Sequence, residues 1–408
     1  MFNIESSINT TLVLFLILMS GSMLHVGFVI PTYICFMTIS LCAIVRINFF
    51  NKKNLRFTLF GFSVFVMVLV ANFIFSSSYS FGNYGTVIAL GLLTFLVIFY
   101  FVSKNVDFKY YLYKVLKAIM ILSLIGFTLS IFDLGTDLQI GDGYQTKTIG
   151  YVFYYYWGET IGPLSFYRNQ GIFWEPGILA VYANIFLFLA LFVYNNKSNT
   201  WLAVLCVLTT FSTTGFLILL IQLAVFFKKN KLSFLKKTFL SIGVLFVVLI
   251  LFLSFSGKKA SAEEEVVSSY GLRSFDLYSG FMVAVTNPFF GVGLNKEAFF
   301  KERNKFIPEE VSGIFELIEE RGNSNSIMQL FYTMGLITAF GTLYMLYRQS
   351  FFKEQRVLFF IIMIISLSSE PLLLSPFFMF FVFSAILFRE NTRCNIINTD
   401  LLMITEKK

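Results

Sequence analysis

The feature of this chain that most limits its fold is a series of apolar runs spread over almost its whole length. There are about twelve, at roughly residues 10 to 24, 27 to 45, 57 to 75, 85 to 102, 115 to 132, 176 to 194, 200 to 212, 214 to 227, 238 to 256, 326 to 347, 357 to 369 and 372 to 388. The longer runs can cross a bilayer core of about 30 Å as helices. Charged residues make up only 13% of the chain, against about 25% in a soluble protein. The sequence therefore predicts an all-α polytopic membrane protein of about twelve transmembrane helices, with residues 1–408 forming a single integral membrane domain.

The basic residues predict how these runs are oriented. Lysines and arginines crowd the connections on one side of the predicted membrane, including both ends of the long run from Thr200 to Phe227. Because basic residues remain mainly on the cytoplasmic side, both termini are expected inside, and this run is expected to form a hairpin of two short helices. The net charge of +8 then reflects membrane orientation and gives no reason to expect nucleic-acid binding.

Two connections on the opposite, outer side are long, at about Asp133 to Glu175 and Gly257 to Asn325. Transporters with many spans commonly bind their substrate at the bilayer midplane, so long outer loops favour chemistry at the membrane surface. Apolar residues recur at helical spacing between Glu309 and Glu320, which predicts an amphipathic helix on the outer leaflet. These loops contain no histidine or cysteine, and their one compact acidic run is Glu263 to Glu265. No metal site is expected there.

The stretch from Arg168 to Gly177 places an arginine and a glutamate where a membrane helix is expected to begin. Proline is favoured at the first helical position, so Glu175 should stand at the entrance of a helix from Pro176 to Tyr194. Ionisable groups at the membrane boundary are costly and indicate a functional site. Glu175 has two interpretations: a general base, or a helix-start acid that pairs with Arg168.

Other polar and aromatic residues also have two interpretations each. Glu370 precedes Pro371 between two apolar runs. It is interpreted either as a second functional carboxylate or as a helix cap. Tyr156 and Trp157 belong to an aromatic segment that offers stacking faces for sugar rings or forms an interfacial belt. Arg303 lies in a run of alternating charges and is interpreted as part of a solvated face.

Four short motifs follow one another along the chain. They are an arginine followed by Gly171 and the Glu175–Gly177 helix start, Thr-Phe-Ser-Thr-Thr-Gly at 210 to 215, Arg273 before Asn287–Gly293, and Asn-Ser-Asn-Ser at 323 to 326 before Gly335. Together they resemble the O-antigen polymerase and ligase superfamily over about residues 57 to 390. The resemblance implies a metal-independent glycosyltransferase without a cofactor, acting on undecaprenyl-diphosphate-linked sugars at the outer face of the bacterial inner membrane.

The same resemblance singles out residues for this chemistry. Transfer from a diphosphate carrier builds negative charge on the leaving group, which arginines bind as permanently charged forks. Arg168 and Arg273 are expected to form this clamp, and Arg321 adjoins the next motif. Asp276 lies three residues after Arg273 and is expected to orient it. Asn325 matches the amide residue of the superfamily and is expected to contact substrate.

One position separates the two activities of the superfamily. Ligases carry a histidine just before the amide residue, whereas here Ser324 precedes Asn325, and the one histidine of the chain is His25. This favours a polymerase of polysaccharide or lipopolysaccharide biosynthesis; an O-antigen ligase stays the alternative, and a lipid-linked oligosaccharide flippase or transporter is the alternative from another class. The expected partners are the lipid bilayer, an undecaprenyl-diphosphate-linked oligosaccharide, a chain-length regulator and a flippase.

Overall fold

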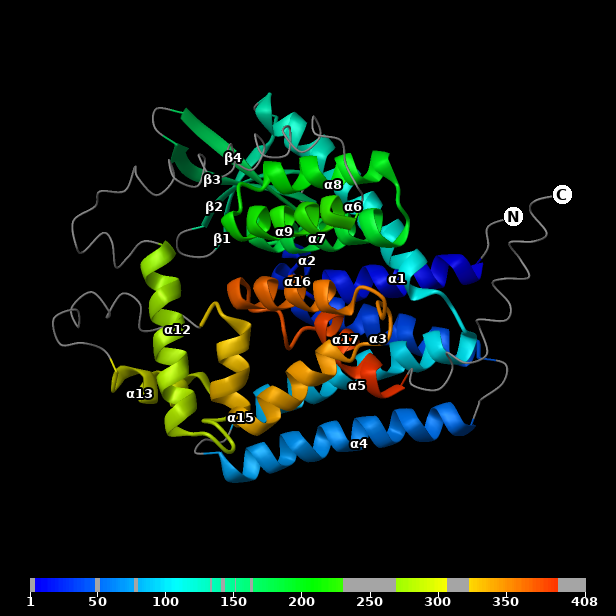
Figure 1. Cartoon of the computed structure of the whole chain (residues 1–408), viewed down its shortest axis with the longest axis vertical. Coiled ribbons are helices and arrows are strands. Elements are labelled where there is room, and N and C mark those ends of the chain that lie inside the picture. The colour runs from blue at the N-terminus through cyan, green and yellow to red at the C-terminus, as the bar shows by residue number, and fades with distance from the viewer. Residues whose placement is uncertain are drawn as a thin grey trace.

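The computed structural model describes residues 4–47, 52–76, 80–132, 134–140, 144–150, 152–161, 164–229, 269–306 and 323–387, most of them in helices (Figure 1). The helices are α1 (Ile4–Leu18), α2 (Met23–Gly27), α3 (Val29–Val45), α4 (Lys52–Phe75), α5 (Phe81–Lys104), α6 (Phe108–Ile131), α7 (Pro176–Phe188), the π-helical turn η1 (Leu189–Val193), α8 (Lys197–Thr209), α9 (Thr213–Lys229), α12 (Ser269–Thr286), α13 (Lys296–Asn304), α15 (Ser326–Tyr347), α16 (Arg356–Ser369) and α17 (Pro376–Leu387). Eleven of the twelve predicted runs contain a helix, and the run at 238 to 256 lies outside the described residues.

The described helices are those of a polytopic membrane protein. Five stretches are long and apolar enough to cross a bilayer, namely Asn54–Phe75, Phe81–Lys104, Phe108–Ile131, Pro176–Val193 and Ser326–Tyr347. Shorter apolar helices accompany them at Ile4–Leu18, Val29–Val45, Arg356–Ser369 and Pro376–Ile386. A span shorter than the bilayer core is accommodated by local thinning or by neighbouring protein. The count of about twelve spans stays a prediction.

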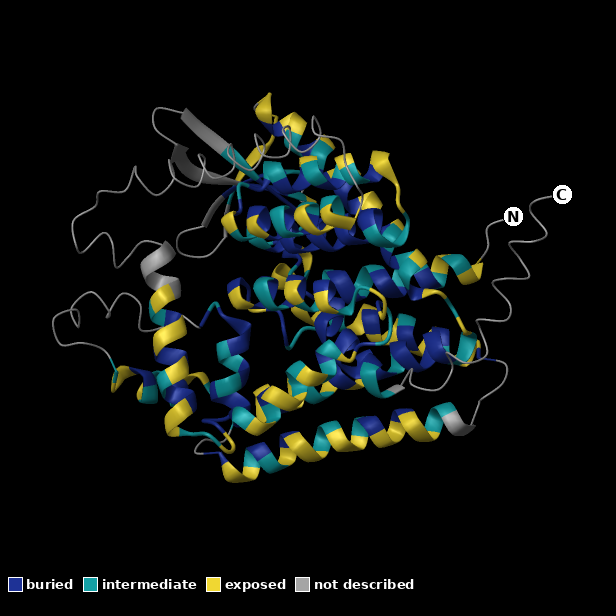
Figure 2. Ribbon diagram, viewed as in Figure 1, coloured by how far each residue is buried: buried dark blue, intermediate teal, exposed yellow. Residues whose placement is uncertain are grey.

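Helix α7 is the buried centre of the bundle. It packs against α6, α8, α9, α16 and the end of the sheet, and Figure 2 shows it buried along its length, whereas α4 exposes much of its surface. Every residue from Ile178 to Phe188 is buried. Because this burial is by other parts of the protein, α7 is surrounded on every side. The start of α7, where the sequence places Glu175, is therefore held by neighbouring elements.

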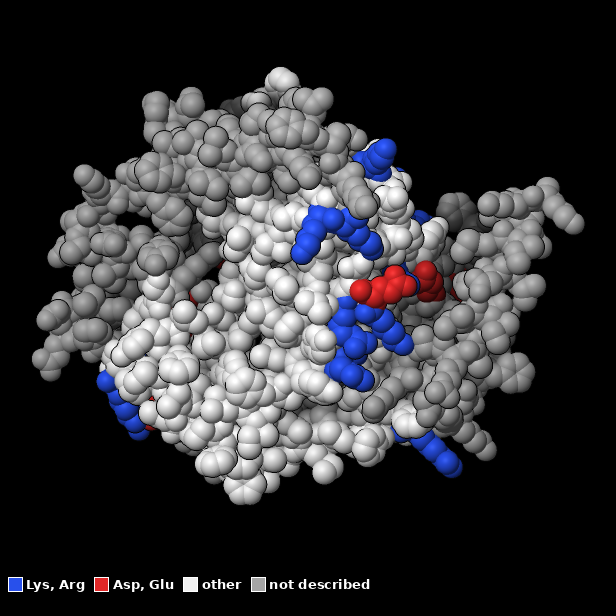
Figure 3. All heavy atoms as spheres, in the orientation of Figure 1, with Lys and Arg blue, Asp and Glu red and all other residues white. Residues whose placement is uncertain are grey.

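The helices run back and forth between two ends of the bundle. In Figure 1, α1 begins at the right-hand end and α17 runs toward it, whereas the sheet, α12 and α13 lie at the left-hand end. Figure 3 shows lysines and arginines gathered in the right-hand half of the described surface, with a smaller group at the left edge. A basic end that carries both ends of the described chain is what the predicted orientation requires, and the orientation itself stays a prediction.

The segment expected as the first outer loop contains a sheet, so the all-α prediction is wrong for this part of the chain. The strands are β1 (Thr136–Ile140), β2 (Tyr144–Ile149), β3 (Phe153–Ile161) and β4 (Leu164–Gly171), antiparallel in the order β1-β2-β3-β4. The aromatic residues of β3 favour strands. The sheet packs on the C-terminal part of α6, where a Cβ at Gly126 would lie 1.9 Å from the Tyr155 hydroxyl. Gly126 therefore makes room for the buried Tyr155 ring.

Helices α8 and α9 confirm the predicted hairpin. Their connection has Phe211 in the left-handed region at φ 48°, and the Ser212 hydroxyl oxygen accepts a hydrogen bond from the Gly215 N–H at 3.2 Å. A Cβ at Gly215 would lie 2.7 Å from the Cβ of Ala180 on α7. The polar residues of this turn thus satisfy backbone groups where two short helices meet.

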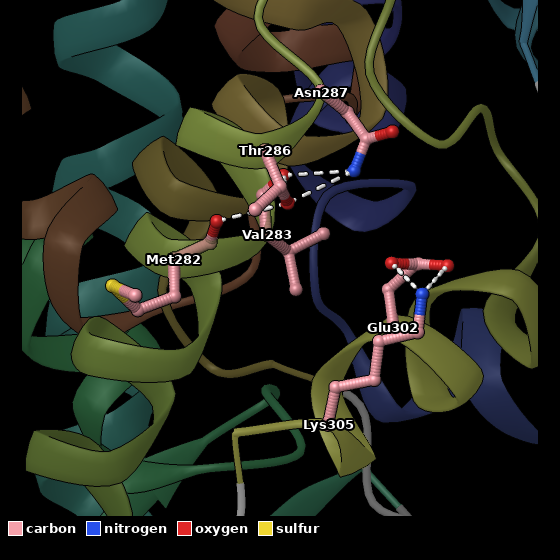
Figure 4. A network of polar contacts seen from close by, with 6 residues as sticks. All are labelled: Met282, Val283, Thr286, Asn287, Glu302 and Lys305. Carbon is pink, nitrogen blue, oxygen red and sulfur yellow. Dashed lines mark hydrogen bonds and ion pairs between the residues drawn. The ribbon is translucent and has the colours of Figure 1, made fainter.

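The end of α12 is closed by its own side chains. Figure 4 shows Asn287 directed back toward the last turn of the helix, where its amide donates to the Val283 carbonyl at 3.1 Å. The Thr286 hydroxyl donates to the same carbonyl at 3.0 Å. These bonds occupy a carbonyl at the end of the helix. The chain then turns sharply toward α15.

Helix α15 is broken at Gly335, and the turn after α12 fills the break. Gly335 has φ 77° and ψ 165°, a conformation that residues with a Cβ rarely adopt. The N–H of Val292 donates to the Tyr332 carbonyl at 2.7 Å, and that of Gly293 donates to the Thr333 carbonyl at 3.1 Å. The backbone of one segment therefore satisfies carbonyls that the interrupted helix leaves.

A buried asparagine on α4 completes this junction. The Asn72 amide donates to the Phe290 carbonyl at 2.5 Å and to the Thr333 carbonyl at 2.9 Å, and its oxygen accepts from the Tyr84 hydroxyl. Gly291, at φ 65°, lies so close to α15 that a Cβ would be 2.3 Å from the Tyr332 carbonyl oxygen. Gly291 and Gly293, both with positive φ, form a tight turn against α15.

Gly335→Ala should destabilise the protein, whereas Gly341→Ala on the same helix should not. A Cβ at Gly335 would lie 2.1 Å from the Phe289 carbonyl oxygen, and one at Gly341 meets nothing within 4 Å. The left-handed backbone alone costs about 1–2 kcal/mol for a residue with a Cβ. The melting temperature in detergent should fall clearly for Gly335→Ala and stay near wild type for Gly341→Ala. Equal melting temperatures would contradict the break in α15.

Alkaline phosphatase fused after Lys229 should be inactive, and the same reporter fused after Asn295 should be active. The first point follows α9 at the basic end of the bundle and the second lies beside α13 at the opposite end. Because the reporter folds only outside the cytoplasm, it reports the side directly. Activity at Lys229, or its absence at Asn295 at equal fusion levels, would overturn the orientation.

Candidate functional site

The segment between β4 and α7 is held in place by the loop after α1. The Trp174 N–H donates to the Gly21 carbonyl at 3.2 Å, and the Met23 N–H donates to the Ile172 carbonyl at 2.9 Å. These backbone bonds join segments that lie about 150 residues apart in the sequence. The chain therefore enters α7 through a fixed backbone path.

Glu175 is the N-cap residue of α7, as predicted. It has extended backbone angles of φ −138° and ψ 148°, and Pro176 follows at the first helical position. Its side chain is half-buried. The helix dipole favours an ionised carboxylate at this end. The structure thus holds an acidic group at the start of the most buried helix, at the same end of the bundle as the sheet.

Arg168 lies on β4 and binds the turn between α8 and α9. Its Nε donates to the Thr210 carbonyl at 3.0 Å, and its Nη2 donates to the Phe211 carbonyl at 3.4 Å. Beside it, the Asn169 amide donates to the Thr209 hydroxyl at 3.1 Å. Two of the five N–H donors of the arginine fork are used by this turn. The guanidinium is therefore held at the turn of the hairpin.

Glu370 brings a second carboxylate to the start of α7. It follows α16 with an extended backbone, is 2% exposed, and lies so close to Gly177 that an added Cβ there would be 1.9 Å from its Oε1. The Glu370 carbonyl accepts a hydrogen bond from the Ser326 hydroxyl at 2.5 Å. The expectation that Pro371 starts the next helix is wrong, because α17 begins at Pro376. The intervening turn places Glu370 against α7 instead.

Asn325 and Asp276 each have a structural partner. The Asn325 side-chain oxygen caps α15 by accepting from the N–H groups of Ile327 and Met328, both at 3.0 Å. The Asp276 carboxylate accepts from the Ser324 N–H at 3.0 Å and from its hydroxyl at 2.7 Å. Asp276 therefore ties α12 to the segment before α15. Substrate contact by either residue, and orientation of Arg273 by Asp276, stay predictions.

Several predicted site residues fall outside what the structure describes. Arg321 and the predicted helix from Glu309 to Glu320 lie within 307–322, and the side chains of Arg273, Tyr156 and Trp157 are likewise outside the description. Their backbones place Arg273 on α12, and Tyr156 opposite Arg168 in the register of β3 and β4. The convergence of Arg168, Glu175 and Arg273 stays a prediction. Among the described residues, no group of three or more His, Cys, Asp or Glu side chains is placed to hold a metal ion.

The interpretation of Arg303 as a solvated residue is wrong. It is 1% exposed, with its guanidinium carbon 4.8 Å from the centre of the Phe300 ring, 5.6 Å from Phe299 and 5.8 Å from Phe275. The neighbouring Lys305 does pair with Glu302 at the surface, at 2.6 Å (Figure 4). The sequence signal for this burial was the spacing of Arg303 from Phe299 and Phe300, because residues three and four apart on a helix share a face. Two phenylalanines at that spacing indicate the buried side of α13.

One comparison with known proteins bears on this architecture. Residues 198–343 match the family model described as O-antigen ligase, a little over a third of the chain. The match runs from α8 to α15 and includes the turn that fills the break at Gly335. It agrees with the resemblance to the O-antigen polymerase and ligase superfamily. No curated protein and no solved structure matches the chain.

Arg303→Ala should destabilise the protein, and Lys305→Ala should leave its stability nearly unchanged. A desolvated cation over aromatic rings contributes about 2 kcal/mol or more, whereas an exposed substitution changes stability by about 0.5 kcal/mol or less. Melting temperatures of the two variants in one detergent provide the comparison. Equal values would show that Arg303 is not buried among these rings.

Proposed function

We propose that this protein is a polysaccharide polymerase of the O-antigen type. It would transfer a growing glycan from undecaprenyl diphosphate to a new lipid-linked repeat unit at the outer face of the inner membrane. The observation that carries the proposal is the start of α7, where Glu175 caps a buried membrane helix and Arg168 is fixed at the adjoining hairpin. The family match over residues 198–343 supports the same class.

The proposed chemistry needs an anion site beside a proton acceptor. The bond from the sugar's anomeric carbon to the diphosphate breaks, and the diphosphate leaves with the bonding electron pair. The Arg168 fork would neutralise that charge, together with Arg273 if the two loops converge. Glu175 would accept the proton of the acceptor hydroxyl as the new glycosidic bond forms. Because both groups lie at the end of membrane helices, the lipid tail of the donor can remain in the bilayer.

A ligase is the second candidate, since the family model that matches carries that description. The position where ligases of the superfamily have a histidine is occupied by Ser324, whose hydroxyl donates to Asp276 at 2.7 Å. A hydroxyl held in this way ties two helices together and is not an imidazole base. This observation favours polymerase over ligase. A flippase would require polar groups along a path through the bundle centre, whereas the centre of α7 is apolar apart from Asn184, which pairs with Gln222 of α9 at 3.1 Å.

Arg168→Lys should lose most polymer formation, and Glu175→Gln should slow it by about 10²-fold or more. Lysine keeps the charge of Arg168 but not its fork, and glutamine keeps the shape of Glu175 but not its basicity. The measurement is the polymer ladder in a strain lacking its own polymerase, with each variant quantified in membranes. Glu297→Gln, which changes an exposed carboxylate on α13, is the matched control and should give a normal ladder.

The outcomes separate the candidates. Normal ladders from both Arg168→Lys and Glu175→Gln at normal membrane levels would remove these residues from the site. Loss of the proteins from the membrane would instead show that the two side chains serve only the fold. If the wild-type protein gives single repeat units attached to lipid A core, the ligase alternative stands. Restoration of activity in chelator-treated membranes by magnesium or calcium would contradict metal independence.

A further inference from the structure

We propose that Glu370 is a positioning residue that sets the first turn of α7, and with it Glu175. The inference rests on the proposed function, because it assigns Glu370 a part in transfer at the same site. The carboxylate occupies the space where any side chain at position 177 would lie, 1.9 Å from the built Cβ position. Gly177 is the second residue of α7, two positions after Glu175.

Glu370 lies where it can fix the backbone position of the first turn of α7. Residue 176 is a proline and has no N–H, so the backbone of the first turn depends on few hydrogen bonds of its own. The N–H groups of Ile178 and Leu179 reach the Glu175 carbonyl at 3.2 and 3.5 Å. A carboxylate against this turn also lies at the positive end of the helix dipole. Moving the Glu370 side chain therefore moves or loosens the turn that carries Glu175.

Glu370 itself is anchored from a different part of the chain. The Ser326 hydroxyl donates to the Glu370 carbonyl, and it accepts from the Leu372 N–H at 2.6 Å and the Leu373 N–H at 3.2 Å. Ser326 is the first residue of α15 and follows its cap, Asn325. Glu370 thereby couples the start of α15 to the start of α7. This coupling joins the two motif-bearing regions that the resemblance singled out.

The test uses a clash and its relief. Gly177→Ala should displace the carboxylate, and a misplacement of about 1 Å at a catalytic group can cost about 10²-fold in rate. Glu370→Asp withdraws the carboxylate by one carbon–carbon bond, about 1.5 Å. The double variant Gly177→Ala with Glu370→Asp should therefore transfer glycan faster than Gly177→Ala alone. Turnover should change and KM for the lipid-linked donor should not, because positioning of a general base acts in the transition state.

Two matched controls test whether the relief is specific. Gly215→Ala also creates a clash, but with Ala180 at 2.7 Å, so Glu370→Asp should not relieve it. Gly341→Ala introduces a Cβ into open space and should retain wild-type turnover. Melting temperatures of all variants in detergent give a second measurement of the contact that does not depend on activity. The double variant should melt closer to wild type than Gly177→Ala does.

The results that overturn the inference differ from those that overturn the function. If wild-type protein makes no polymer, the proposed function fails, and the melting temperatures still report whether Glu370 packs on Gly177. If wild-type protein is active but Gly177→Ala has normal turnover, Glu370 does not set the first turn. A double variant as slow as Gly177→Ala, together with an inactive Glu370→Gln, would make Glu370 a catalytic residue instead.

Discussion

Lipid offers no hydrogen bonds, so every break in a membrane helix of this protein has to satisfy its backbone groups within the protein. At the turn between α8 and α9, the guanidinium of Arg168 binds the Thr210 and Phe211 carbonyls. At Gly335, the turn after α12 and the Asn72 amide supply the donors. At an interrupted helix, hydrogen-bonding groups from other segments must therefore bind the backbone groups that the helix leaves unsatisfied. The contacts at the α8–α9 turn and at Gly335 follow from this requirement.

This requirement explains why residues with proposed chemical roles also hold the fold together. Arg168 binds a hairpin turn, Asn325 caps α15, and Asp276 binds Ser324. A functional arginine or carboxylate at a membrane boundary needs partners that fix its geometry, and broken helices offer such partners. Loss of activity in a variant of these residues therefore has two physical causes, which membrane level and melting temperature separate.

Local signals in the sequence predicted the helices well and the contacts between them poorly. The length of the apolar runs predicted the helices, and the proline after Glu175 predicted the start of α7. Both signals depend on neighbouring residues alone. The sheet was missed because the aromatic residues of β3 were interpreted as stacking faces for sugar rings or as an interfacial belt, within a segment expected to be a loop. Arg303 was missed because its charged neighbours suggested a solvated face. The contact of Glu370 with Gly177 joins segments nearly 200 residues apart, and no local pattern reports it.

Glycines offer a physical route to such contacts, because a missing Cβ in a packed helix makes room for something else. Gly126 makes room for Tyr155, Gly177 for Glu370, and Gly215 for Ala180. One of these neighbours, Glu370, is a charged group from a segment nearly 200 residues away, and Gly177 and Gly215 lie in the first turns of their helices. Glycine costs helix stability relative to alanine, so its use at these positions needs a compensating contact. In this protein those contacts lie at the end of the bundle that contains Arg168 and Glu175. The packing of that end therefore depends on side chains that occupy the space left by the missing Cβ of glycine.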